Sequence, residues 1–188
     1  MVAPGLGVAV SDMWTSPEND PRSYGNPVGE LATYRAYLGN YRLTIEMKCE
    51  GLDADQLARR SVPPSTMSLL ALVRHLAKVE NHWFQRVLRG RTDVARLYQG
   101  EDDRDLDFSG AVADPAVVED GFAAWKREIA AADEWLDALD EAGLGREVGL
   151  GDDMVATRDV LVHLIEEYAR HAGHADLLRE CIDGRTGQ

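Results

Sequence analysis

Four long stretches of this sequence place apolar residues at steps of three and four, the spacing that brings side chains to one face of an α-helix. Gly51 and Gly90 follow the first two stretches, and Asp114 with Pro115 gives the third a capping residue and a first-turn proline. No segment shows the sustained alternation of a strand. The pattern therefore predicts an all-α protein, a four-helix bundle with crossover loops of about 15 to 25 residues. Its helices are expected at about 29–50, 65–89, 114–142 and 157–182, with Ser65 or Thr66 capping the second.

The segments outside these helices carry their own signals. Residues 1–26 are rich in Pro, Gly, Ser and Asn, and they predict an extended N-terminal arm whose Trp14 and Tyr24 pack on the body or on a neighbouring subunit. Residues 53–60 favour a short helical turn. Residues 91–112 include the acidic run EDDRDLD and predict a long loop, placed to cover a site. A chain of 188 residues supports one core, so we expect residues 27–188 to form one domain.

The last predicted helix carries a pattern typical of metal sites. In its run HLIEEYARHAGH, spacings of four, four and three place His163, Glu167, His171 and His174 on one face. Imidazole and carboxylate together suit divalent metals such as Zn²⁺, Ni²⁺ or Mn²⁺. Residues eight apart rise about 12 Å along a helix, so His163 and His171 cannot share an ion. The pairs left open are His163 with Glu167, Glu167 with His171, and, with less favourable geometry, His171 with His174.

Any such pair needs a further ligand from another helix. The other histidines of the chain, His75 and His82, both lie in the second predicted helix. They are seven residues and about 10 Å apart along its axis, so one ion takes one of them and not both. The residues therefore predict a site built between two helices, without deciding which histidine completes it.

Two segments, VRHLAKVENHWF and HLIEEYARHAGHADLLRE, resemble the DinB-like superfamily of metal-binding four-helix bundles. The branch they resemble most is the one related to the N-terminal domain of mycothiol-dependent maleylpyruvate isomerase, and the resemblance covers about residues 28–183. It implies that His75, Glu167 and His171 bind the metal. Many members have histidine where this chain has Glu167, and the glutamate favours the isomerase-like branch. A counterpart of that isomerase's second domain is not recognisable, so we do not expect the same substrate.

Three protein ligands leave a coordination position open, which is typical of catalytic sites. The resemblance favours activation of mycothiol or another small thiol for S-transfer or isomerisation, with zinc as the expected metal and nickel, manganese or iron as alternatives. The same position suits water and hydrolysis, and a non-catalytic metal-binding stress-response protein is a third interpretation. Glu167, His174 and His163 are the catalytic candidates, although a structural role for the two histidines is equally compatible with the sequence. Trp83 and Tyr168 are expected to bind the cosubstrate, in a pocket that Trp125 also lines.

Composition narrows the range of binding partners and cellular compartments that we expect for this protein. A formal net charge of −13 argues against sequence-independent binding to the phosphates of a nucleic acid. No apolar run approaches the roughly 20 residues that cross a bilayer, and no secretion signal is recognisable. Cys49 and Cys181 belong to no CxxC pair and are expected in the core, as fits a reducing cytoplasm. We expect a cytoplasmic enzyme that acts on small molecules, and we expect the protein to form a homodimer.

Overall fold

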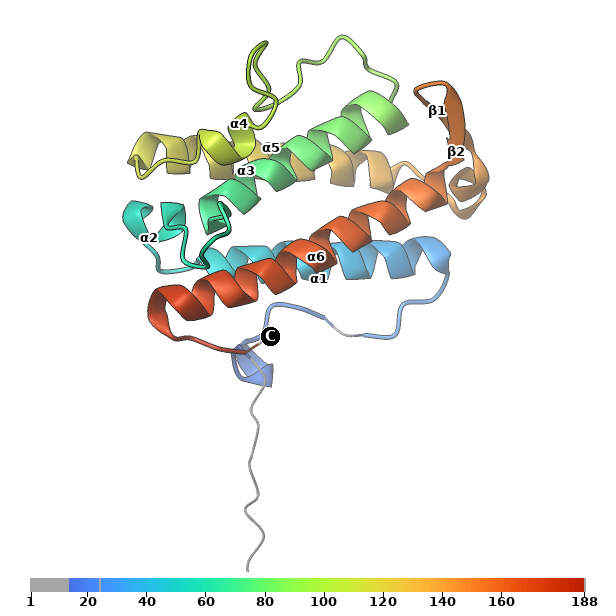
Figure 1. Cartoon of the computed structure of the whole chain (residues 1–188). Helices are drawn as coiled ribbons and strands as arrows, with labels where there is room; N and C mark the ends of the chain where they lie inside the picture. The colour runs from blue at the N-terminus through green and yellow to red at the C-terminus, as the bar shows by residue number, and fades with distance from the viewer. Residues whose placement is uncertain (1–13, 24, 188) are drawn as a thin grey trace, which may run out of the picture.

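The computed structural model describes residues 14–23 and 25–187, and it confirms the predicted helical bundle (Figure 1). Helix α1 packs against α6 in one layer and α3 against α5 in the other, while α3 and α6 also touch between the layers. None of the helices among the described residues is both long and apolar enough to cross a membrane. The four long helices are α1 (Glu30–Cys49), α3 (Leu69–Glu80), α5 (Pro115–Asp137) and α6 (Thr157–Asp183).

The ends of these helices follow local capping chemistry. Asp114 caps α5 through a hydrogen bond from the backbone N–H of Ala116, as the Asp-Pro pair predicts. Helix α3 begins later than expected, because Ser68 is the residue whose side chain accepts the N–H of Ala71. The prediction of Ser65 or Thr66 as its cap was wrong.

The second long helix changes geometry partway along its length. After α3 the chain continues as the π-helix η2 (Asn81–Leu88), and the bond from the Arg89 N–H to the Phe84 carbonyl spans five residues. The sequence predicted one uninterrupted α-helix here, because the apolar positions alone do not distinguish the two winding patterns. Gly90, at a φ of 66°, follows the end of this element.

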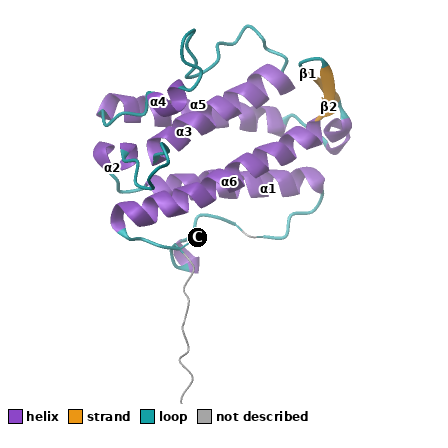
Figure 2. Ribbon diagram, viewed as in Figure 1, coloured by secondary structure: helices purple, strands orange, loops and turns teal. Residues whose placement is uncertain are grey.

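A small hairpin, shown in orange in Figure 2, corrects the expectation that the chain has no strands. Strands β1 (Glu147–Leu150) and β2 (Asp153–Ala156) pair antiparallel between α5 and α6, with Glu147 opposite Ala156. Four-residue strands are too short for alternation to stand out in the sequence. Helix α5 also ends at Asp137 rather than near residue 142, and the 3₁₀ turn η3 (Glu141–Gly145) follows it.

The remaining elements are short. They are the 3₁₀ turn η1 (Pro17–Asn19), the expected helical turn α2 (Ala54–Ala58), and α4 (Leu106–Ser109), which interrupts the predicted acidic loop. The arm packs on the body, because the indole of Trp14 is buried and lies 4.0 Å from Lys48 Nζ and 3.6 Å from the Arg185 guanidinium. Tyr24 lies outside the described residues.

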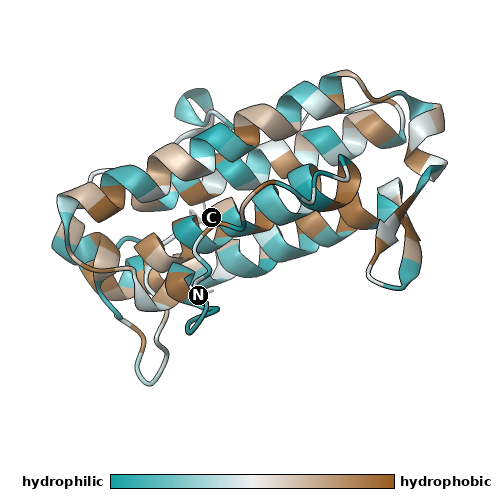
Figure 3. Cartoon of the chain, turned by 90° about the horizontal axis from the view of Figure 1, so that it is seen from above, coloured by the Kyte–Doolittle hydropathy of each residue, from teal (hydrophilic) through white to brown (hydrophobic). Residues whose placement is uncertain are grey.

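The carboxylate of Glu80, at the end of α3, is fully buried in the core between the layers. Apolar and polar residues alternate along the helices (Figure 3), and the apolar faces enclose Glu80 so completely that its exposed fraction is 0%. Arg42 of α1 donates two hydrogen bonds to it, of 2.8 and 2.9 Å. Tyr168 of α6 donates a third, of 2.7 Å, and accepts one of 2.8 Å from the indole of Trp125 on α5. All four helices therefore meet in one hydrogen-bonded network.

Removing the hydroxyl at the centre of this network should destabilise the bundle. In Tyr168→Phe, the buried Trp125 N–H has no acceptor and Glu80 loses a donor, so we expect the free energy of unfolding to fall by about 1–3 kcal/mol. Urea denaturation followed by circular dichroism measures the change. Tyr37→Phe is the control, because that side chain is exposed. Equal stability of the two variants would contradict this role of the hydroxyl.

Candidate metal centre

The three predicted metal ligands meet at the contact between α3 and α6. His75 comes from α3, and Glu167 and His171 from successive turns of α6. One ligand atom from each lies within 4.8 Å of the other two. Glu167 Oε2 is 3.4 Å from His171 Nε2 and 3.9 Å from His75 Nε2. Two ligands of one zinc ion, each about 2.0–2.2 Å from it, are at most about 4.4 Å apart, so the two distances from Glu167 suit a shared ion.

The protonation state of His171 also suits a ligand. Its ring is largely buried, and burial together with the neighbouring His75 lowers its pKa to about 4. At neutral pH the imidazole therefore carries no charge, and metals bind the neutral form. The rings of His75 and His171 meet edge to face, with their centroids 4.8 Å apart.

A carboxylate outside the predicted set holds His75 in place. Asp107 of α4 is 1% exposed, and its Oδ2 lies 2.8 Å from His75 Nδ1 while its Oδ1 accepts a 2.9 Å hydrogen bond from Lys78. Burial raises the pKa of this carboxyl, but the bonds from His75 and Lys78 outweigh that effect and the pKa is below its usual value. An Asp107 carboxylate requires the proton of His75 on Nδ1, which turns the lone pair of Nε2 toward Glu167.

The position of Asp107 depends on α3 as well. Arg74, the residue before His75, donates hydrogen bonds to the backbone carbonyls of Leu106 and Asp107, at 2.9 and 3.3 Å. Helix α4 is therefore fixed to the turn of α3 that carries His75. The ring of Phe108 also packs against His75, at 5.2 Å between centroids. The acidic run predicted a loop over the site, but it has four aspartates and nothing in it singled out Asp107.

The other α6 histidines lie next to the three predicted ligands. His163 Nε2 is 3.7 Å from Glu167 Oε1, the carboxylate oxygen that does not face His75 and His171. Its ring meets Trp83 of η2 edge to face, with the ring centroids 4.8 Å apart, so Trp83 lies beside the candidate metal centre. His174 lies behind His171, with their Nδ1 atoms 3.3 Å apart.

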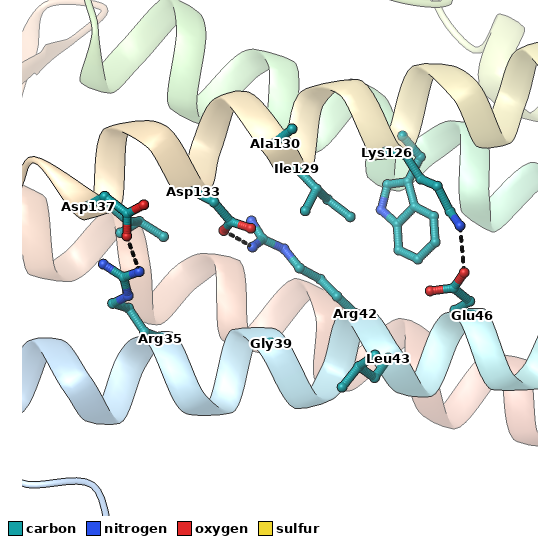
Figure 4. A pocket seen from close by; sticks show the side chains of 12 residues that line it. Arg35, Gly39, Arg42, Leu43, Glu46, Lys126, Ile129, Ala130, Asp133 and Asp137 are labelled. Atoms are coloured by element: carbon teal, nitrogen blue, oxygen red, sulfur yellow. Dashed lines mark hydrogen bonds and ion pairs between the residues drawn. The ribbon is translucent and has the colours of Figure 1, made fainter. Parts of the chain in front are cut away.

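Tyr168 and Trp125 occupy different surroundings from those expected. Tyr168 is fully buried, and its hydroxyl lies between Trp125 and Glu80 in the core, so this placement gives it no contact surface for a cosubstrate. Trp125 is 1% exposed and faces a cavity of about 660 Å³ between α1 and α5 (Figure 4). Adjacent residues on a helix point about 100° apart, which is why Glu167 faces the histidines while Tyr168 faces the core.

Charged side chains bridge the cavity in Figure 4 from one wall to the other. Three ion pairs span it from α1 to α5, and none of the histidines lines it. Two of these pairs, Arg42 with Asp133 and Lys126 with Glu46, have contacts of 2.7 and 2.6 Å. The third joins Arg35 to Asp137. The size of a cavity alone therefore does not identify the functional site of this protein.

The sequence comparison identifies the group of proteins that this chain resembles. Residues 33–184 match the family model described as mycothiol-S-transferase. No curated protein matches the sequence at a significant level. Among solved structures, a conserved protein from Enterococcus faecalis has a similar fold, with a TM-score of 0.61 and 16% sequence identity over 81% of this chain and 96% of that one. At this identity the likeness concerns the fold alone.

The two cysteines differ in environment. Cys49 is buried in the core, as expected, and burial raises the pKa of its thiol to about 12. Cys181 is exposed on α6, so its expected core position was wrong. It lies ten residues beyond His171, where the helix has turned a different face to the bundle.

This difference in exposure predicts how the two cysteine thiols of the folded protein react. At pH 8 the Cys49 thiol is far below its pKa and shielded from solvent, so Ellman's reagent should titrate one thiol in the folded protein and two in urea. In Cys181→Ser the folded protein should show no fast-reacting thiol. Rapid labelling of Cys49 in that folded variant would contradict its buried position.

Proposed function

Because the chain belongs to the mycothiol-S-transferase family, we propose that it transfers mycothiol or a related small thiol to an electrophile at a divalent-metal site formed by His75, Glu167 and His171. One observation carries the proposal. Ligand atoms from two separate helices, two ring nitrogens and one carboxylate oxygen, lie within 4.8 Å of one another. Such convergence of two imidazoles and a carboxylate suits a catalytic metal with an open position.

The donor set fits a borderline divalent metal. Two imidazoles and one carboxylate suit zinc, and nickel, manganese and iron are alternatives that cellular supply decides between. A divalent ion in this position stabilises the thiolate, which is the nucleophilic form of a thiol. The protein supplies the geometry, because Asp107 sets the tautomer of His75 and α6 fixes the spacing of Glu167 and His171.

The proton that the thiol loses needs an acceptor near the same point. His163 suits this role because its side chain is 40% exposed and its Nε2 lies 3.7 Å from the free oxygen of Glu167. His174, behind His171, suits a positioning role through the 3.3 Å contact between their rings. Trp83 forms an aromatic wall beside His163 and lines a small cavity next to His75.

Metal analysis with a matched pair of variants tests the proposal. Untagged wild-type protein should bind about one divalent ion per chain, and Glu167→Gln should bind it at least about 10- to 100-fold more weakly, since it loses a charged ligand. Glu166→Gln is the control, because Glu166 is the exposed neighbour on the same turn. Mycothiol added to the cobalt-substituted protein should produce a thiolate charge-transfer band, and the enzyme should consume mycothiol with an alkylating electrophile.

Other results would redirect the proposal. Metal binding without a thiol response, together with hydrolysis of activated esters, would overturn thiol transfer in favour of a hydrolase. Metal binding with neither activity would indicate a non-catalytic metal-binding protein. Folded wild-type protein that takes up no divalent metal would show that the histidines are structural.

The role of Asp107 has a separate test. Asp107→Asn removes the charge that holds the proton on His75 Nδ1, so we expect metal affinity to fall by about 10- to 100-fold while the helical spectrum is unchanged. Competition with a chromogenic chelator measures the affinity. Asp102→Asn, in the same acidic run, should bind metal like the wild type. Equal affinity of both variants would show that Asp107 does not position His75.

A further inference from the structure

A small cavity adjoins the candidate metal centre on the side of η2. Its volume is about 200 Å³, and its walls come from α3, η2 and the loop before α4. His75, one of the proposed ligands, forms part of the wall, so the cavity opens directly beside the site. The side chains on which its chemistry depends are His75, Lys78, His82, Trp83, Arg96 and Leu97.

The charges around this cavity are unbalanced. Lys78 is neutralised by Asp107, at 2.9 Å. Arg96 is exposed, and within residues 14–23 and 25–187 it has neither an ion pair nor a hydrogen bond. The cavity therefore presents one guanidinium without a counterion, and guanidinium groups bind carboxylates through paired hydrogen bonds.

A second polar group in the wall also lacks a partner. The Nδ1 atom of His82 is buried and makes no hydrogen bond with any described residue. Burial, followed by the positive charges of Arg96 and Arg86, lowers the pKa of His82, so its ring is neutral at pH 7. A neutral imidazole donates from one nitrogen and accepts at the other, and an unsatisfied buried nitrogen calls for a partner. Because this nitrogen is covered, a carboxylate bound to Arg96 would reach it once the ring turns Nδ1 toward the cavity.

The volume of this cavity limits the size of the molecule that it can hold. A volume of about 200 Å³ is below the roughly 300–1,000 Å³ of pockets that hold drug-sized ligands, so the cavity suits a smaller molecule. Mycothiol, with two ring units beside its cysteine, is too large. Phe108, which packs on His75, lines another cavity, of about 530 Å³, where a larger thiol has room. The apolar surfaces of Trp83 and Leu97 suit the carbon skeleton of a small molecule.

We propose that the small cavity holds the electrophile of the transfer reaction, and that this electrophile is a small acid whose carboxylate binds Arg96 and the free ring nitrogen of His82. The inference rests on the proposed thiol transfer and adds the chemical class of the second substrate. Arg96 then acts as a specificity-determining residue, since it binds the carboxylate rather than the reacting carbon and orients that carbon toward the thiol.

Iodoacetate and iodoacetamide form a matched pair of probes, because they have nearly the same size and differ in charge. With either probe, the thiol in the enzyme loses its proton to His163, which passes it on to the buffer. The thiolate sulfur bonds to the CH₂ carbon, and the carbon–iodine bond breaks to release iodide. Each enzymatic kcat/KM is divided by the uncatalysed rate constant with mycothiol, which corrects for intrinsic reactivity. A Cys181→Ser background removes the exposed thiol from competition.

We expect the corrected kcat/KM to favour iodoacetate over iodoacetamide, and Arg96→Gln to reduce this preference by about five- to tenfold, with little effect on iodoacetamide. Arg91→Gln is the control, because Arg91 is exposed in the same loop and does not line the cavity. Transfer with no preference for the acid, or a preference that survives in Arg96→Gln, would overturn the inference and leave the proposed function standing.

A binding experiment separates the inference from the proposed reaction. Propionate and propionamide are unreactive, and their binding to the metal-loaded protein is followed by the NMR signals of the His82 ring, assigned with His82→Gln. Propionate should shift these signals in the wild type and in Arg91→Gln, at concentrations about five- to tenfold lower than in Arg96→Gln. If these shifts occur while the protein turns over neither iodo compound, the result supports the anion site and contradicts the proposed thiol transfer. Equal shifts with both probes, or none with propionate, would contradict the anion site.

Discussion

The buried carboxylate of Glu80 is the constraint on which the arrangement of the helices depends. A charge without water needs several hydrogen bonds, and each of its partners comes from a different helix. Arg42 supplies the counterion from α1, and Tyr168 supplies a donor from α6 while binding Trp125 of α5. Buried ion pairs contribute little net stability compared with apolar packing, but losing one partner is costly. The network thus disfavours rotations of α6 that would turn Tyr168 away from the core.

This fixed rotation also positions the candidate metal centre. Glu167 directly precedes Tyr168, and His171 follows one turn after Glu167, so a helix that turns Tyr168 into the core turns the other two toward α3. On α3, Glu80 enters the network and His75 lies five residues earlier. The two helices that bear the proposed ligands are therefore joined by a polar contact within the core, and the separation of His75 from Glu167 follows from it.

Charge is distributed unevenly around the centre. A chain of net charge −13 nevertheless places Lys78 and Arg96 beside His75, while Asp107 is the carboxylate buried against its ring. One side of His75 thus faces a negative group that orients it, and an adjoining wall carries Arg96, which has no ion pair with any described residue. Such an arrangement lets a site in an acidic protein attract an anionic molecule, since local fields near a site depend on its neighbouring charges more than on net charge.

Much of this protein follows from the sequence by itself. Periodic apolar residues determined the four long helices, and helical spacing brought Glu167 and His171 to one face, because both effects are local to a helix. The resemblance added His75 as their partner. Only the tertiary structure decided the role of Asp107, the burial of Tyr168 and the cavity beside Arg96, because each depends on segments far apart in the chain. The same holds for the hairpin, whose short strands are recognisable only once they pair.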